Sequence, residues 1–322
     1  MAAVLKFRNA LGDARDVDLS RAGPTEFQVL IKSAHDADLA ERGWACIQQR
    51  DEVYGDCMPW EKTQKRIRFR PGEVTAWIGP NRDGKSLLLG YLAAHWALQE
   101  TPVLMCSLEM DIGTQLKRLS RQFLGTETPD KAVYDMLAAR LFYLDFFDYT
   151  GHVPAAKMAA IVRFAASQAT ARHIIIDNLT LIVPPSRDSD AQAASFVRDL
   201  VVIARDTGTH IHLVAHVRKP MDDRVMLNRY DWRGTGACPD MVSNVIIVQG
   251  NERKRRAVAK GDSSRVSEAD VFVTVDKQRN GEFHGQLKFW WRPAALQLVE
   301  YGSDEPYRFD PTDLTAWEKG ER

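Results

Sequence analysis

Apolar residues along this chain follow two alternating patterns from about residue 73 to residue 216. Short unbroken apolar runs, such as Val103-Leu104-Met105 and Ile174-Ile175-Ile176, predict strands that are buried on both faces. Between these runs lie longer segments in which apolar residues recur at the helical period. The alternation predicts an α/β fold, with a mostly parallel sheet covered by helices. The expected strands cover residues 73–79, 102–107, 141–146, 173–177 and 210–215, and the expected helices cover residues 84–99, 111–124, 154–169 and 190–205.

Beyond residue 240 the pattern changes to short apolar strands that are separated by turns rather than by long helices. The expected strands cover residues 245–248, 271–275, 286–291 and 296–299. They predict a β-rich C-terminal edge that is added to the core sheet.

The N-terminal region carries a separate helical signal. Residues 25–49 have apolar positions at roughly helical spacing, with Thr25 as a candidate N-cap. The spacing is equally compatible with a helix packed on its own domain and with a short helical arm that binds a partner. Residues 50–70 have the composition of a linker, so we expect a domain boundary near residue 60. The expected organisation is an arm and linker over residues 1–60, a core domain over 61–305 and a tail over 306–322.

Composition and charge narrow the class of protein. The 322 residues are 45% hydrophobic and 27% charged, which is ordinary for a globular chain. The 43 basic and 43 acidic residues cancel, so any affinity for nucleic acid must come from local basic patches. The four cysteines form no CxxC pair, which argues against zinc fingers and disulfide frameworks. No apolar run approaches the length of a membrane span, so we expect a cytoplasmic protein with no membrane partner.

One stretch fits the phosphate-binding pattern GxxxxGK[ST] between an expected strand and an expected helix. It consists of Gly79, Pro80, Asn81, Arg82, Asp83, Gly84, Lys85 and Ser86. In this pattern the glycines let backbone N–H groups wrap the phosphates, the lysine reaches the β- and γ-phosphates and the serine ligates Mg²⁺. The stretch therefore predicts a site for ATP, or another NTP or dNTP, with Mg²⁺ as cofactor.

Three further polar residues follow expected strands and should meet the nucleotide at the carboxyl edge of the sheet. Asp177 ends an apolar strand and is the candidate for the second Mg²⁺-coordinating group. Glu109 could deprotonate the attacking water, or it could compensate the dipole of the next helix. His216 could contact the γ-phosphate, although a histidine at a strand end is more often structural.

Basic residues gather in two stretches that are expected to be loops. The first holds Arg218, Lys219, Arg224, Arg229 and Arg233, and the second holds Arg253, Lys254, Arg255 and Arg256. Such loops suit phosphate tracking along a single strand, whereas a single basic run is usually a solvated surface. Two successive runs favour binding of single-stranded DNA.

The order of these motifs resembles that of the hexameric replicative DNA helicases with a RecA-like core, a group that includes DnaB, mitochondrial Twinkle and the helicase half of bacteriophage primase-helicases. The resemblance covers about residues 60–300. The matching stretches are 71–86, 107–110, 175–178, 215–220, 233–237 and 277–281.

The resemblance implies roles for individual residues and partners. Glu109 would be the catalytic base and His216 the γ-phosphate sensor, while Arg233 and Gly234 would open a DNA-facing segment. Lys277 and Arg279 would act on the neighbouring subunit's nucleotide, with Arg279 as arginine finger. The implied assembly is a homo-hexamer or heptamer ring that moves 5′ to 3′ on single-stranded DNA.

The resemblance also carries wider expectations. A separate primase or loader is a further partner that it suggests, and a phage or prophage origin fits by analogy. No primase module precedes the core in this sequence, so we expect no primase activity from it.

Two other functions share the same fold and nucleotide site. One is a RecA-like ATPase that does not unwind DNA, such as a recombinase filament or an assembly switch. The other is a helicase loader that binds nucleotide to hold a partner. The stretch 233–237 and the Lys277/Arg279 spacing favour the helicase.

Overall fold

The computed structural model describes residues 4–8, 14–18, 54–128, 130–217, 226–233 and 236–308. The chain divides into two compact units, Met1–Tyr54 and Gly55–Arg322. In the first unit, strands β1 (Val4–Arg8) and β2 (Ala14–Asp18) form an antiparallel pair. The helix expected over residues 25–49 lies outside the described residues.

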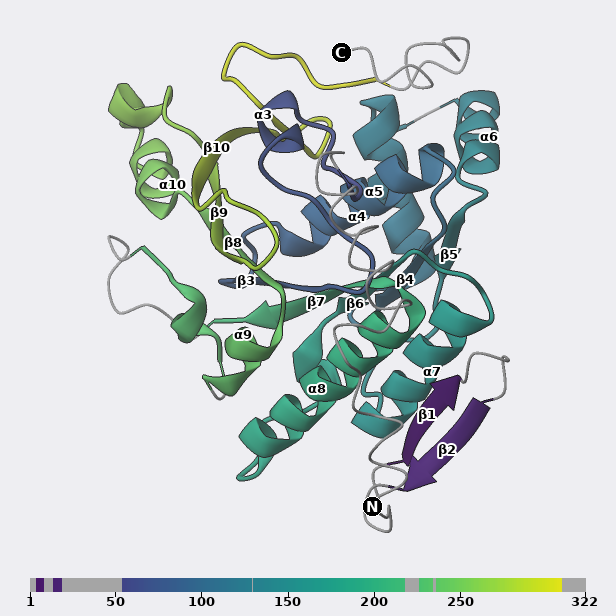
Figure 1. Ribbon diagram of the computed structural model, residues 1–322. Helices are drawn as coiled ribbons and strands as arrows, with labels where there is room; N and C mark the ends of the chain where they lie inside the picture. Colours follow the sequence, from purple (N-terminus) through teal and green to yellow (C-terminus); the bar gives the residue numbers. More distant parts are fainter. Residues whose placement is uncertain are drawn as a thin grey trace. The chain divides into compact units, whose positions relative to one another are not determined.

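A nine-stranded sheet runs through the second unit (Figure 1), in the order β11-β10-β9-β8-β3-β7-β6-β4-β5. All neighbouring pairs from β8 to β5 are parallel, and β9, β10 and β11 extend the sheet in antiparallel fashion. The strands are β3 (Val74–Gly79), β4 (Val103–Ser107), β5 (Leu144–Phe146), β6 (His173–Asp177), β7 (His210–His216), β8 (Asn244–Gly250), β9 (Val271–Gln278), β10 (Gly285–Arg292) and β11 (Gln297–Val299). The predicted parallel core and β-rich C-terminal edge are both confirmed.

Helices cover both faces of this sheet (Figure 1). One face carries α4 (Lys85–Leu98), α5 (Ile112–Leu124) and α6 (Lys131–Arg140), and the other carries α7 (Ala155–Ser167), α8 (Ser189–Thr207) and α9 (Ala237–Met241). Each face has its own apolar cluster, because residues of β3, β6 and β7 alternate between the two sides. Burial on both faces explains the apolar runs of the central strands, although His173, His210 and His212 are also buried there.

Residues 55–70, whose composition is that of a linker, fold onto this core. Met58, Ile67 and Phe69 are buried, and the indole N–H of Trp60 donates to the carbonyl of Leu298 over 3.0 Å. The short helix α3 (Glu61–Gln64) lies within this segment. This segment therefore belongs to the second compact unit, which begins at Gly55.

The structure contains two helices, α6 and α10, that the sequence analysis does not predict. Helix α6 exposes most of its surface and buries only Leu137, so its apolar periodicity is weak. Helix α10 (Glu252–Ala259) contains the basic run 253–256, which we expected to be a loop. That expectation is wrong because Asn251 caps the segment, its side chain accepting from the backbone N–H of Lys254 over 3.0 Å. Among the described residues, no helix combines the length and apolar character needed to span a membrane.

Candidate active site

The predicted phosphate-binding loop lies between β3 and α4 at the carboxyl edge of the parallel strands. Gly79 has φ +155°, and a Cβ there would lie 2.0 Å from the carbonyl oxygen of Val248, so only glycine fits. Gly84 has φ +91° and precedes the first residue of α4. The loop therefore delivers the positive end of a helix dipole to the position where phosphates would bind.

Lys85 is the first residue of α4, and its side chain is directed back into the loop. Its ammonium donates to the carbonyl oxygens of Gly79 over 2.8 Å and Pro80 over 2.7 Å. Burial lowers the pKa of Lys85, while the carboxylates of Asp177, Asp83 and Glu109 oppose that shift. A buried cation among three carboxylates is suited to exchange its carbonyl partners for phosphate oxygens.

Asp177 ends β6 beside this lysine and is buried. Burial raises its pKa to about 6, and the nearby Glu109 carboxylate adds to the effect. A hydrogen bond from the Ser86 hydroxyl and the charges of Lys85 and Arg118 work in the opposite direction. The Ser86 and Asp177 oxygens therefore lie next to each other, as the sequence predicts.

These two oxygens fit Mg²⁺, which prefers oxygen ligands and keeps places for substrate phosphates and water. Within the described residues, no cluster of three or more His, Cys, Asp and Glu side chains could hold a metal on its own. A nucleotide-borne magnesium ion needs no such cluster, because the phosphates supply ligands. Ser86 and Asp177 are the residues that would complete its shell.

Glu109, Asn178 and His216 meet beside Asp177. The amide nitrogen of Asn178 contacts a carboxylate oxygen of Glu109 and lies 3.1 Å from Nε2 of His216. Its carbonyl oxygen accepts from the backbone N–H of Thr180, which fixes the orientation of the amide. Burial, followed by the charge of Lys85, lowers the pKa of His216. The motif match 175–178 includes Asn178, but its bridging role was not predicted.

The alternative role of Glu109 as a charge at a helix terminus does not fit this geometry. Helix α5 begins at Ile112, and its N-cap is Asp111, whose side chain accepts from the backbone N–H of Thr114 over 2.9 Å. Glu109 is exposed and precedes that cap. Its carboxylate is therefore available for chemistry at the strand edge.

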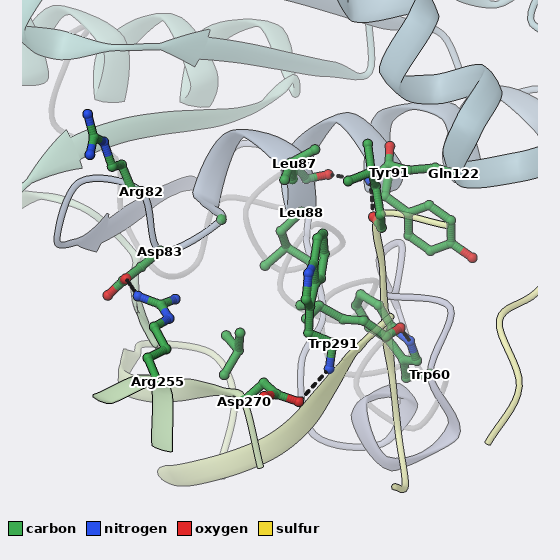
Figure 2. A pocket seen from close by; sticks show the side chains of 14 residues that line it. Trp60, Arg82, Asp83, Leu87, Leu88, Tyr91, Gln122, Arg255, Asp270 and Trp291 are labelled. Atoms are coloured by element: carbon green, nitrogen blue, oxygen red, sulfur yellow. Dashed lines mark hydrogen bonds and ion pairs between the residues drawn. The ribbon is translucent and has the colours of Figure 1, made fainter. Parts of the chain in front are cut away.

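A cavity of about 320 Å³ adjoins the loop (Figure 2). The loop forms one end, and Leu88, Tyr91, Trp60 and Trp291 supply apolar and aromatic walls. The backbone N–H of Trp291 donates to Asp270 over 2.9 Å, which holds this wall in place. Aromatic walls next to a phosphate site are suited to a planar base.

Lys277 and Arg279 lie far from this loop. The ammonium of Lys277 donates to the carbonyls of Pro239 and Asp240 over 2.8 Å, and Arg279 also donates to Asp240 over 2.6 Å. Burial, and then the charge of Arg279, lower the pKa of Lys277 to about 8. Both residues lie near the beginning of β8, whereas the loop contacts its end at Gly250.

The residues expected to bind DNA fall into three groups. Arg218, Lys219, Arg224 and Gly234 lie outside the described residues. The second group, Arg229 and Arg233, lies within the described residues. Arg229 lies 3.7 Å from the carboxylate of Asp276, and Arg233 is exposed.

The third group is the basic run 253–256 on α10, and not all of its side chains are free to bind DNA. Lys254 is buried, and its ammonium contacts the Glu268 carbonyl and the Asp270 carboxylate, both over 2.7 Å. Arg255 pairs with Asp83 of the loop. For Lys254 the expectation of a DNA contact is wrong, because its ammonium is buried and paired inside the protein. The Arg255 side chain is 44% exposed, so a DNA contact by Arg255 stays a prediction. Arg253 is exposed, and Arg256 pairs with Glu252 over 3.1 Å.

The fold and the phosphate-binding loop together define a P-loop nucleotide-binding site on a mostly parallel α/β sheet. Residues 64–222 match the family model described as an AAA domain. This stretch includes the loop, Glu109, Asp177 and His216.

Two solved structures extend the comparison. The first, described as an ATPase domain, is similar with a TM-score of 0.67 and 17% identity, covering 82% of this chain and 99% of that one. The second, a DnaB-like replicative helicase described with its interactions with primase, has a TM-score of 0.65 and 15% identity, covering 89% of this chain and 71% of that one. These matches confirm the fold that the resemblance to replicative helicases implies. No curated protein matches the chain.

Proposed function

We propose that this protein is an ATP-dependent replicative DNA helicase that forms a ring and moves along single-stranded DNA. The ring would be a homo-hexamer or heptamer with a nucleotide at each junction between subunits. By the resemblance of its motifs, it would move 5′ to 3′.

The observation that carries the proposal is the separation of Arg279 from the P-loop of its own subunit. The backbone N–H of Arg279 donates to Ser243, just before β8, and Gly250 at the end of β8 donates to Asp83. These positions are about 24 Å apart at roughly 3.4 Å per residue. An arginine so placed is suited to a neighbour's nucleotide, where it would stabilise transition-state charge.

Chemistry at each junction would use the cluster at the strand edge. Lys85 and Ser86 would hold the phosphates and Mg²⁺, with Asp177 as the second protein oxygen. Glu109 would orient and deprotonate the attacking water. His216 would respond to the γ-phosphate, since Asn178 connects it with Glu109.

A hydrogen-bonded path from this cluster toward the proposed DNA-facing residues supports the motor function. The carbonyl of His216 accepts from the backbone N–H of Arg233 over 2.9 Å, and Val217 pairs with Trp232 in an isolated bridge. The stretch before residue 234 is therefore attached to the strand that carries His216. A shift of His216 on hydrolysis would reach the DNA-facing residues through these bonds.

The solved DnaB-like helicase is described with primase, and we propose a separate primase or loader as a partner of this chain as well.

The test is DNA unwinding by the full chain. A forked duplex with a fluorescent strand should be separated only with hydrolysable nucleotide and Mg²⁺, and Lys85→Ala should abolish the activity. Nucleotide should also convert the protein to a ring that is visible by native mass spectrometry. Hydrolysis that is indifferent to single-stranded DNA, with no oligomer, would contradict the proposal and favour a switch or loader.

A further inference from the structure

The P-loop of this chain contains a carboxylate next to its phosphate-binding lysine. Asp83 is 6% exposed, and its charge is one of those that act on Lys85. A triphosphate that enters the loop would meet this negative charge across a short distance. A positively charged group beside Asp83 would reduce this repulsion between the carboxylate and the triphosphate.

Arg255 of α10 supplies the opposite charge, as Figure 2 shows. One guanidinium nitrogen lies 2.7 Å from Oδ1 of Asp83, and the backbone N–H of Gly250 donates to Oδ2 over 2.9 Å. Both carboxylate oxygens are thus occupied on the side facing β8 and α10. The carboxylate is thereby held toward α10.

The residues around Arg255 leave space for its guanidinium and fix the start of α10. A Cβ on Gly250 would lie 2.1 Å from the guanidinium, so the glycine leaves the space that Arg255 fills. The base of α10 is fixed by the Asn251 cap and by the buried ammonium of Lys254, which contacts Asp270 over 2.7 Å. Arg255 therefore approaches the P-loop from a rigid helix.

We propose that Arg255 is a positioning residue for the P-loop, which holds and neutralises Asp83 so that the loop accepts a nucleoside triphosphate. This inference rests on the nucleotide site of the proposed function. It makes α10 a determinant of nucleotide affinity rather than a DNA contact at this position.

The test is the affinity of the full chain for ATP and ADP with Mg²⁺, measured by titration calorimetry without DNA. Arg255→Gln should weaken ATP binding about tenfold and ADP binding less, because the triphosphate carries more charge. Lys260→Gln removes one positive charge from the end of the same helix and should leave the affinity unchanged.

Asp83→Asn tests whether Arg255 acts by neutralising the charge of Asp83 or only by holding the loop in place. Asp83→Asn keeps an acceptor for Gly250 and removes the charge, so Arg255→Gln combined with Asp83→Asn should return to within about twofold of wild-type affinity. Arg255→Lys, which keeps the charge, should bind ATP better than Arg255→Gln and guards against a folding defect.

Three results would overturn the inference: wild-type ATP affinity of Arg255→Gln, a double variant as weak as Arg255→Gln, or Arg255→Lys as weak as Arg255→Gln. Lys85→Ala distinguishes a failure of this inference from a failure of the proposed nucleotide site. If Lys85→Ala binds ATP normally, the nucleotide site itself is misassigned. If Lys85→Ala loses binding and Arg255→Gln does not, only the role of Arg255 fails.

Discussion

The amide nitrogen of Asn178 lies 3.1 Å from Nε2 of His216, across two neighbouring strands. The same nitrogen contacts Glu109, which follows a third strand, β4. One side chain thus connects the candidate base with the candidate phosphate sensor. An amide can donate to both, because it carries two N–H groups.

Removing this connection should slow hydrolysis without affecting nucleotide binding. We expect Asn178→Ala to lower kcat about 10- to 100-fold, since Glu109 and His216 lose the group that orients them. The dissociation constant for nucleotide should stay within about threefold of wild type, because the Asn178 side chain bonds with Glu109, His216 and Thr180. Steady-state hydrolysis and a binding titration measure the two quantities. Asn178→Asp, which keeps the acceptor for Thr180 but not the donor, should be equally slow. A wild-type kcat in both variants would contradict the bridging role.

Glu109→Gln tests the base directly. The amide can still form hydrogen bonds but cannot take a proton from water, so turnover should fall about 10²- to 10⁴-fold while nucleotide still binds. Single-turnover hydrolysis measures the loss, and the binding titration is the control. Unchanged turnover would remove Glu109 from its assigned role.

Three buried histidines form a second polar cluster, on the opposite edge of the sheet. Trp77 donates to Nδ1 of His212 over 3.1 Å, so Nε2 of His212 carries the proton and donates to His173 over 3.0 Å. His173 in turn donates to Asp56 over 2.9 Å. His210 contacts the carbonyl of Arg70 over 2.6 Å, so the nitrogen that faces it carries the proton. These contacts define the tautomer that each ring has in its neutral form.

This cluster predicts a loss of stability in acid. Burial lowers the pKa of His173 and His212, and lowers that of His210 to about 3. The unfolded chain protonates these groups near pH 6.5, so it binds more protons than the folded chain between about pH 6.5 and 3. The free energy of unfolding should therefore fall with pH in that window, by up to about 1.4 kcal/mol per pH unit for each histidine.

One carboxyl works against this effect. The pKa of Asp177 is raised to about 6, so this group stabilises the folded state as pH falls from about 6 toward 3.8. The stabilisation by Asp177 in acid is smaller than the combined loss of stability from His173, His210 and His212. Urea unfolding at pH 7, 6 and 5 measures the sum, and His210→Gln should reduce the slope. An unfolding free energy that is constant over this range would contradict the neutral cluster.

Gly79 predicts a stability effect that is separate from catalysis. Gly79→Ala would push a Cβ against the Val248 carbonyl, so we expect a loss of about 3 kcal/mol or more in the free energy of unfolding. Gly84→Ala is the matched control, because its Cβ meets nothing within 4 Å and only the positive φ opposes it, at about 1 kcal/mol. Equal stabilities of the two variants would contradict the close approach of β3 and β8.

The sequence alone predicts the core strands and the P-loop, because both are local signals: unbroken apolar runs and a fixed motif. It does not predict α6 or α10, which bury one residue each and therefore have little apolar periodicity. The Asn178 bridge depends on three strands being neighbours. The Asp83–Arg255 pair joins residues 172 positions apart, and no local pattern signals it.

The most direct test of the central claim, hydrolysis at junctions between subunits, mixes two inactive proteins. Arg279→Ala keeps Glu109, and Glu109→Gln keeps Arg279, so neither should hydrolyse nucleotide alone on single-stranded DNA. In an equimolar mixed ring about a quarter of the junctions would combine an intact base with an intact arginine from the neighbour. We predict that mixing restores a corresponding fraction of the wild-type rate. A mixture as inactive as its components, or an Arg279→Ala protein with full activity alone, would contradict catalysis in trans.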